Sequence, residues 1–213
     1  MLLSNLILIP LIGSFLVLFI PSQYKETIKV VVLSFSLAEF LLSLMMWMSF
    51  DNSSSRFQFV EAYNWIESSN IIFYLGVDGI SLFFILLTTL LIPICLLASW
   101  DSVKTAYKEY VIAFLIMEAL LVLVFSVRDL LLFYICFESV LIPMFIIIGV
   151  WGSRERRIRA AYMFFLYTLL GSVLMLLAIL YIYYQAGTTD YQILLTTTFD
   201  PEEIGRASCR ERV

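Results

Sequence analysis

The chain has 213 residues, of which 62% are hydrophobic and 14% are charged, whereas a soluble domain carries about 25% charged and about 45–50% apolar residues. Such a chain cannot cover a surface that faces water, so most of its area must face lipid or other apolar protein. The formal net charge of −4 is less informative about topology than the positions of the charges along the chain. The usual estimate of one domain per ~150 residues does not apply, because it assumes a core surrounded by water.

Six stretches are long and apolar enough to cross a membrane. A spanning helix needs ~20 mostly apolar residues, and lipid offers no partner to unpaired backbone groups, so each stretch is predicted to be helical. The predicted spans are residues 2–20, 30–49, 80–100, 110–127, 130–150 and 160–184. We expect the first to be a retained span, because no basic segment precedes it. Prolines inside spans should kink the helices without ending them: Pro10, Pro93 and Pro143.

The connection 51–78 differs from the others, because it is long and contains two stretches that favour β-structure. Residues 57–66 and 71–75 are rich in aromatic and β-branched residues, and Ser and Asn between them supply turn chemistry. We therefore predict a β-hairpin in this outer loop. Asp78 stands where the N-cap of the third span is expected.

The basic residues fall mainly on one side of the predicted membrane. Three connections on that side carry eight of them: Lys25, Lys29, Lys104, Lys108, Arg154, Arg156, Arg157 and Arg159. The other side has two before the tail, Arg56 and Arg128. Basic loops stay on the cytoplasmic or matrix side, so the N-terminus is predicted to face the intermembrane space or periplasm. The basic run at 154–157 is interpreted as a topology anchor and not as a nucleic-acid site.

Motifs for redox cofactors and metals are missing from the sequence. It has no histidine, no G-x-G-x-x-G after a strand and no P-loop, and the spacing of Cys95, Cys136 and Cys209 suits neither a disulfide framework nor a zinc site. We therefore expect no nicotinamide, flavin, iron–sulfur or metal site on this chain, and we interpret the cysteines as small hydrophobic residues.

Three acidic residues lie inside apolar spans: Glu39, Glu118 and Glu138. A charged side chain at the centre of a membrane helix costs about 2.5–3.5 kcal/mol on insertion scales. Each acid should therefore face protein or a water-filled cavity, which makes it a candidate for proton transfer. The alternative for each is a protonated, hydrogen-bonded structural carboxyl.

Glu118 and Glu138 are expected at the same depth. They flank the tight turn at Arg128 and Asp129, and counting 1.5 Å per residue places both roughly 13–15 Å from that turn. Two carboxyls at one depth could relay a proton, but the sequence leaves open whether they face each other. Pro143 has no N–H to donate to the Ser139 carbonyl. This leaves an unpaired acceptor near Glu138 to which water could donate a hydrogen bond.

The fifth predicted span carries a recognisable signature, Leu-Leu-Leu-Phe-Tyr-Ile-Cys-Phe-Glu-Ser-Val-Leu-Ile-Pro-Met at 130–144. It resembles the fifth helix of the subunit-4 family of proton-pumping NADH:quinone oxidoreductase, respiratory complex I. The stretches 149–152, 160–172 and 75–81 are similar to the same family. The resemblance extends over about residues 1–201.

The resemblance implies a fold and a site. The family fold is an all-α polytopic membrane protein of fourteen antiporter-like helices with two inverted repeats, of which this chain would hold the N-terminal six. Glu138 matches the acid of a Glu–Lys pair that controls proton uptake, and its lysine partner lies on the seventh helix, which this chain does not contain. We add Glu118 as a second candidate for proton translocation.

The same resemblance implies partners and a compartment. The chain would be a subunit of an enzyme without an electron-transfer site of its own, while NADH, FMN, iron–sulfur clusters and ubiquinone are handled by other subunits. Its expected partners are other membrane-arm subunits and the lipid bilayer, with no nucleic acid. The expected location is the mitochondrial inner membrane, with a bacterial plasma membrane or a plastid thylakoid membrane as alternatives.

Two alternatives to a complex I subunit remain at this point. One is a subunit of a multisubunit sodium/proton antiporter, which shares the glutamate signature. The other is a membrane anchor without a transport role, against which the three acids inside spans argue.

The polar, basic tail at 203–213 breaks the resemblance abruptly. Its back-translation looks like a common sequencing-library adapter, so we interpret it as a translated adapter joined to a truncated reading frame. The alternative is a genuine exposed C-terminus.

Overall fold

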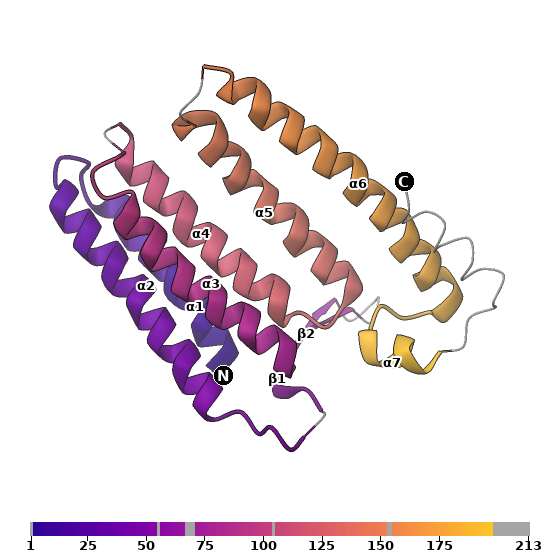
Figure 1. Cartoon of the computed structure of the whole chain (residues 1–213). Coiled ribbons are helices and arrows are strands. Elements are labelled where there is room, and N and C mark those ends of the chain that lie inside the picture. Colours follow the sequence, from indigo (N-terminus) through magenta and orange to yellow (C-terminus); the bar gives the residue numbers. More distant parts are fainter. Residues whose placement is uncertain (1, 55, 67–70, 104, 153–154, 198–213) are drawn as a thin grey trace.

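The computed structural model describes residues 2–54, 56–66, 71–103, 105–152 and 155–197. Six helices in this part of the chain are long and apolar enough to cross a membrane, and they run side by side (Figure 1). They are α1 (Leu2–Phe19), α2 (Lys25–Met48), α3 (Gly79–Ala98), α4 (Tyr107–Ser126), α5 (Leu130–Trp151) and α6 (Arg157–Ala186), followed by the short α7 (Tyr191–Thr196). The predicted class, a polytopic helical membrane protein with six spans, is confirmed.

Several helices begin before the predicted span does. The helix α2 starts at Lys25 and not at residue 30, because its basic first turn has partners that keep it ordered. Lys29 donates to Glu26 across 2.9 Å and lies over the Trp100 ring, 5.0 Å from its centroid. Long basic side chains of this kind reach the membrane surface while their stems stay on apolar protein. The helical backbone therefore extends past the apolar segment that hydropathy detects.

Proline does not end any of the helices that contain it. Pro10, Pro93 and Pro143 lie inside α1, α3 and α5. Neighbouring helices satisfy or shield the backbone groups that a proline frees in a membrane helix. The expectation that these three spans continue through proline is confirmed.

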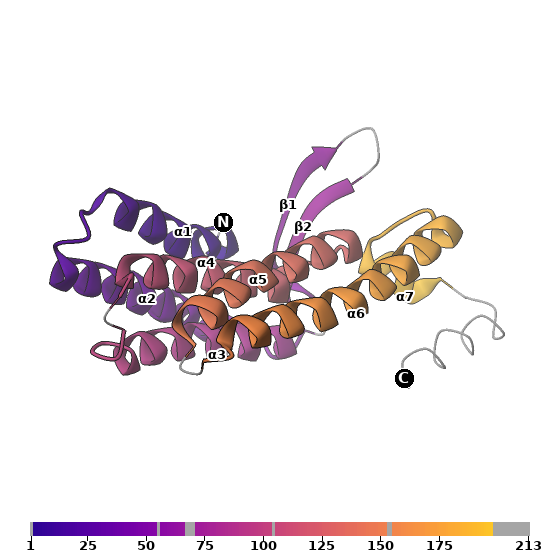
Figure 2. The same ribbon diagram turned by 90° about the horizontal axis from the view of Figure 1, so that it is seen from above.

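The predicted hairpin is also confirmed. Strand β1 (Gln58–Ile66) pairs antiparallel with β2 (Ile71–Val77), with Gln58 opposite Val77. The register shifts between Gln58 and Glu61, where Phe59 has a positive φ of 52°. The hairpin projects from one end of the bundle (Figure 2). It leads directly into α3, whose first turn is capped by Asp78, since the Asp78 Oδ1 accepts from the Ser81 N–H at 2.7 Å.

The helices α1 to α4 form the core of the molecule. Two clusters of buried apolar residues lie between them, one around Leu115 and Val32 and the other around Leu6 and Leu82. The helix α4 occupies the middle and packs against α1, α3 and α5. Within the described residues, 56% of the apolar window of α4 is buried, against 11% for α6. The outer faces of α5 and α6 are therefore available to lipid or further protein.

Candidate functional site

Glu138 lies near the middle of α5 and is half-buried. Its Oε1 accepts a hydrogen bond from the Tyr134 hydroxyl, one turn earlier on the same helix, at 3.3 Å. The Ser172 hydroxyl of α6 donates to the same oxygen. Both partners are neutral, so no cationic side chain balances the charge of this carboxylate within the described residues. Glu138 therefore sits in a polar contact between α5 and α6 that can carry either a proton or a charge.

Ser172 is the partner of Glu138 that sequence reasoning did not single out. It is 4% exposed on a helix whose outer face is largely open, and its oxygen also lies 3.0 Å from the Leu169 carbonyl. The available signal was a hydroxyl beside Gly171 in a mostly apolar stretch that also contains Thr168. Spacing alone does not say which face of α6 that hydroxyl occupies, and so the contact could not be derived.

Glu118 is fully buried on α4, and its neighbour is Glu39 of α2. Glu39 is likewise fully buried, and the two carboxyl groups interact with each other. None of their four oxygens meets the geometry of a hydrogen bond with any described group. The structure thus joins Glu118 to the acid of the second helix, while Glu138 is bound to the sixth. The equal depth left open whether Glu118 and Glu138 face each other, and the interactions of the described residues join them to different partners.

The turn between α4 and α5 fixes both helices at the end where the hairpin lies. Arg128 is 4% exposed. Its guanidinium carbon lies 4.1 Å from the Phe57 ring centroid and 4.4 Å from that of Tyr74, which stabilises a cation by contact with aromatic faces. Its backbone N–H donates to the Tyr74 carbonyl at 3.0 Å. Arg128 thereby fastens the turn to the hairpin.

Asp129 fastens the same turn to the chain beyond α6. Its Oδ1 accepts from the Leu132 N–H at 2.9 Å and caps α5. Its other oxygen accepts from the Thr189 hydroxyl. Such a cap satisfies one of the free N–H groups at the start of a helix. The rotation of α5, and with it the direction of Glu138, is therefore set partly from this end.

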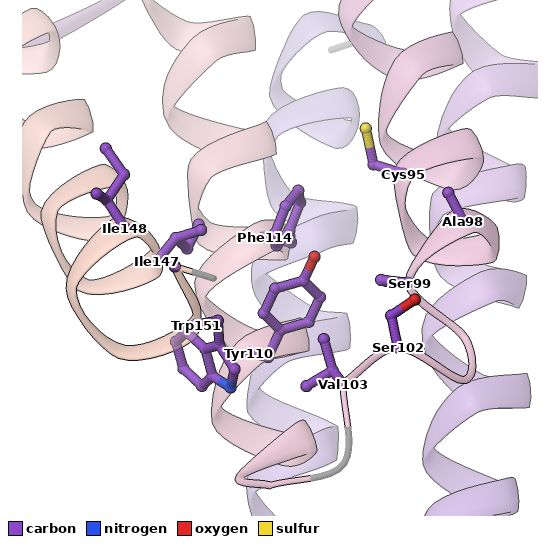
Figure 3. Close-up of a pocket in the computed structure, with 11 residues that line it drawn as sticks. Cys95, Ala98, Ser99, Ser102, Val103, Tyr110, Phe114, Ile147, Ile148 and Trp151 are labelled. Carbon is purple, nitrogen blue, oxygen red and sulfur yellow. The ribbon is translucent and has the colours of Figure 1, made fainter. Parts of the chain in front are cut away.

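A hollow of about 530 Å³ lies at the opposite end of the bundle. Figure 3 shows Tyr110 and Phe114 of α4 facing it, with Trp151 of α5 on one side and Cys95 of α3 on the other. The Trp151 indole N–H donates to the Thr105 carbonyl at 3.0 Å and holds the two sides together. Acidic and basic side chains are absent from its described lining, so this hollow is separate from the sites of Glu39, Glu118 and Glu138.

Residues 5–128 match the family described as NADH-ubiquinone oxidoreductase chain 4, amino terminus. The chain belongs to this family. Residues 127–209 match a second description, NADH:quinone oxidoreductase/Mrp antiporter, TM, which covers α5 and Glu138.

Individual members of the chain 4 family are similar over most of the present sequence. The NADH-ubiquinone oxidoreductase chain 4 of Arabidopsis thaliana is 62% identical over 197 residues, which is 92% of this chain and 40% of the relative. That of Marchantia polymorpha is 60% identical over the same share of each chain. The chain thus spans about 40% of the length of these curated relatives.

A solved structure shares the fold. It is a chain of respiratory complex I from Thermus thermophilus with bound NADH, 27% identical, with a TM-score of 0.80. The match covers 94% of the present chain and 40% of the other. The six-helix arrangement is therefore that of the N-terminal portion of a complex I membrane subunit.

Proposed function

We propose that the chain is the N-terminal part of a proton-translocating membrane-arm subunit of NADH:ubiquinone oxidoreductase, and that Glu138 binds the translocated proton. The family assignment supports membership of this complex, because residues 5–128 match chain 4 specifically. The contact between Glu138 and Ser172 supports the assignment of proton binding to Glu138. It is an acid inside a membrane helix whose described partners are all neutral hydroxyl groups.

The environment of Glu138 suits reversible proton binding. As a carboxylate it accepts hydrogen bonds from Ser172 and Tyr134; when a proton binds to the carboxylate, the neutral acid no longer needs either donor. The missing helices lie beyond this chain, and the family resemblance places there a lysine that would favour the charged form. Its approach or withdrawal would then move the proton.

We propose that electron transfer takes place on other subunits, so that this chain contributes no redox cofactor. Its partners would be the other membrane subunits of the complex, and the open faces of α5 and α6 are the surfaces that further helices would cover. The similarity to the chain 4 proteins of land plants favours the mitochondrial inner membrane as the location.

A subunit of a multisubunit antiporter is the second candidate. One observation favours it, because the description that matches residues 127–209 names Mrp antiporters beside NADH:quinone oxidoreductases. The chain 4 match over 5–128 favours the first candidate. Sodium-dependent proton exchange by the full-length protein without other respiratory subunits would establish the antiporter.

The test is the Glu138→Gln variant of the full-length subunit in its assembled complex. This change keeps the shape and removes the ability to bind and release a proton, so assembly should persist while proton-coupled quinone reduction falls severely. Glu138→Asp keeps a carboxyl one methylene shorter and should retain intermediate activity. Glu118→Gln should reduce pumping less than Glu138→Gln does.

Glu109→Gln is the matched control, because Glu109 is an exposed acid at the start of α4 and its loss should leave pumping unchanged. Wild-type pumping by an assembled Glu138→Gln complex would refute the assignment of Glu138.

A further inference from the structure

Glu39 and Glu118 form a buried pair that the proposed role of Glu138 does not use. Both are 0% exposed, and each carboxyl has the other as its interacting group. All four oxygens are inaccessible to solvent and without a hydrogen bond from any described residue. A buried polar atom without a partner is uncommon in native proteins and calls for an explanation.

Charged groups that could balance this pair are absent from the helices around it. The helices α1 and α3, which pack against α2 and α4, contain no acidic or basic residue. On α5 the acid is Glu138, which is bound to Ser172 of α6. On α2 the nearest cation is Lys29, ten residues from Glu39 and so roughly 15 Å along the helix.

Lys29 is in addition occupied at the end of the bundle, where it is bound to Glu26 and lies over the rings of Trp100 and Tyr107. The remaining titratable residues of α2 and α4 also lie near that end: Lys25, Lys108, Glu109 and Tyr110. Two adjacent carboxylates without a cation or solvent cannot both stay ionised, because burial and mutual repulsion both oppose the charge. At least one proton must therefore reside on the pair.

The pair belongs to a polar strip on the buried face of α2. Ser36, Glu39 and Ser43 recur at the three- and four-residue spacing that aligns side chains on one helix face, and all three are 0% exposed. The Ser43 hydroxyl lies 2.8 Å from that of Thr89 on α3. Hydroxyl groups thus flank the carboxyls on both sides along the helix.

Apolar side chains close the polar strip at its two ends. Val32 is 1% exposed and Met46 is 0% exposed, and both lie in the apolar clusters of the core. A proton can leave the pair only when water or another proton acceptor enters between α2 and α4. The polar strip therefore contains groups that can hold a proton, and the apolar side chains at its ends form a barrier that retains it.

We propose that Glu39 and Glu118 are a second proton-binding site, a carboxyl pair that holds a proton between α2 and α4 and exchanges it during turnover of the full-length protein. The exchange rests on the proposed function in proton translocation; the presence of the proton does not. Before the exchange both carboxyls are protonated; in the exchange one proton leaves a carboxyl oxygen for water and that acid becomes a carboxylate, and reprotonation from water restores it. The neighbouring carboxyl stays neutral while its partner is charged.

Infrared difference spectroscopy of the assembled complex, between the resting enzyme and the enzyme supplied with NADH and quinone, tests the site. The C=O stretch of a protonated carboxyl shifts in D₂O and reports its loss or gain of a proton. The wild-type complex should show a component that is reduced in Glu39→Gln and in Glu118→Gln and lost in the double variant. Glu109→Gln should keep it, because Glu109 is exposed at the start of α4 and lies outside the buried pair. The same signal in the double variant as in wild type would overturn the proposal.

A further variant excludes a purely structural explanation. Glu118→Asp keeps a carboxyl between α2 and α4 and should move the C=O band in frequency without abolishing it. A protonated pair whose band does not change during turnover would also overturn the proposal, because the proton would then be static. Electron input from NADH to an artificial acceptor should be unaffected in every variant.

The result is separable from that for Glu138. If Glu138→Gln pumped normally, the proposed role of Glu138 would fail. The presence or absence of the infrared band assigned to Glu39 and Glu118 would still be decided independently by the variants of those two residues.

Discussion

The carboxyl of Glu138 has one hydrogen-bond partner on its own helix and one on the neighbouring helix. Tyr134 donates across 3.3 Å from the same helix, and the Ser172 hydroxyl donates from α6. Because the bond crosses between helices, it fixes the direction of the carboxyl as well as stabilising its charge. The contact therefore makes Ser172 a positioning residue for the proposed proton site.

We expect Ser172→Ala to lower proton-coupled quinone reduction about tenfold, since a hydrogen bond to a charged group is worth about 1.5–3 kcal/mol. Assembly should persist, because the change removes one oxygen. Thr168→Val is the control, since the Thr168 hydroxyl bonds to the Phe164 carbonyl of its own helix at 2.8 Å and has no contact with Glu138. Rates of quinone reduction and of proton uptake into proteoliposomes check this. Equal rates for Ser172→Ala and Thr168→Val would show that the hydrogen bond from Ser172 to Glu138 does not contribute to proton translocation.

Residue identity and depth could be read from the sequence, but side-chain direction could not. The position of an acid within a span follows from counting residues, so all three acids were recognised as candidates. Which helix each one faces depends on the packing of α2, α5 and α6 around α4, and hydropathy does not encode it. The three- and four-residue spacing of Ser36, Glu39 and Ser43 places the three side chains on one face of α2. It did not identify Glu118 as the residue opposite.

At the scale of the elements, the hairpin acts on the helices through the turn between α4 and α5. Arg128 lies between the rings of Phe57 and Tyr74, and its Cδ is where a side chain on Gly76 would have to fit. A Cβ at Gly76 would lie 2.6 Å from that atom. The absence of a side chain at this position therefore permits the hairpin to close over the arginine.

Gly76→Ala should displace Arg128 and destabilise the protein by about 1–3 kcal/mol, the usual penalty for overpacking. Gly79→Ala is the matched control, because a Cβ there meets nothing within 4 Å and alanine favours the helix that Gly79 begins. Thermal unfolding in lipid nanodiscs, followed by tryptophan fluorescence, measures both. A Gly76→Ala protein as stable as wild type would mean that Arg128 can leave its position without loss.

The hairpin could be predicted because its strands and turn have local signals, whereas the contact with Arg128 joins residues far apart in the sequence. The same distinction applies to the helices. Their existence follows from continuous apolar stretches, while their starts depend on partners such as Glu26 and Trp100 for Lys29. Those partners are contributed by packing, and so α2, α4 and α6 begin three to five residues before the predicted spans, whereas α1 and α5 begin where their spans were predicted.

For the whole molecule, the alternation of six helices places the basic connections at one end. The ends of α1, α3 and α5 lie together, and the hairpin and the turn at Arg128 lie at the other end (Figures 1 and 2). Basic connections are retained on the matrix or cytoplasmic side. The hairpin should therefore face the intermembrane space or periplasm.

Single cysteines at two exposed positions test this orientation. In a background in which the native cysteines are serine, Asn52→Cys should react with a membrane-impermeant maleimide added from the hairpin side. Gln23→Cys, in the connection between α1 and α2, should react only after the membrane is permeabilised. Equal reactivity of the two positions in intact membranes would contradict the arrangement of six spans.

The concentration of the core in α1 to α4 has a consequence for synthesis. The fully buried members of both apolar clusters come from residues up to Val122, so the ribosome has delivered every one of them before α5 is made. Protein segments generally fold as units in the order in which they emerge. The first four helices can therefore pack into a folded four-helix unit in the membrane while the rest of the chain is still being translated. The helices α5 and α6 are then added to one side of this unit. Their outer faces stay in contact with lipid until another helix packs against them.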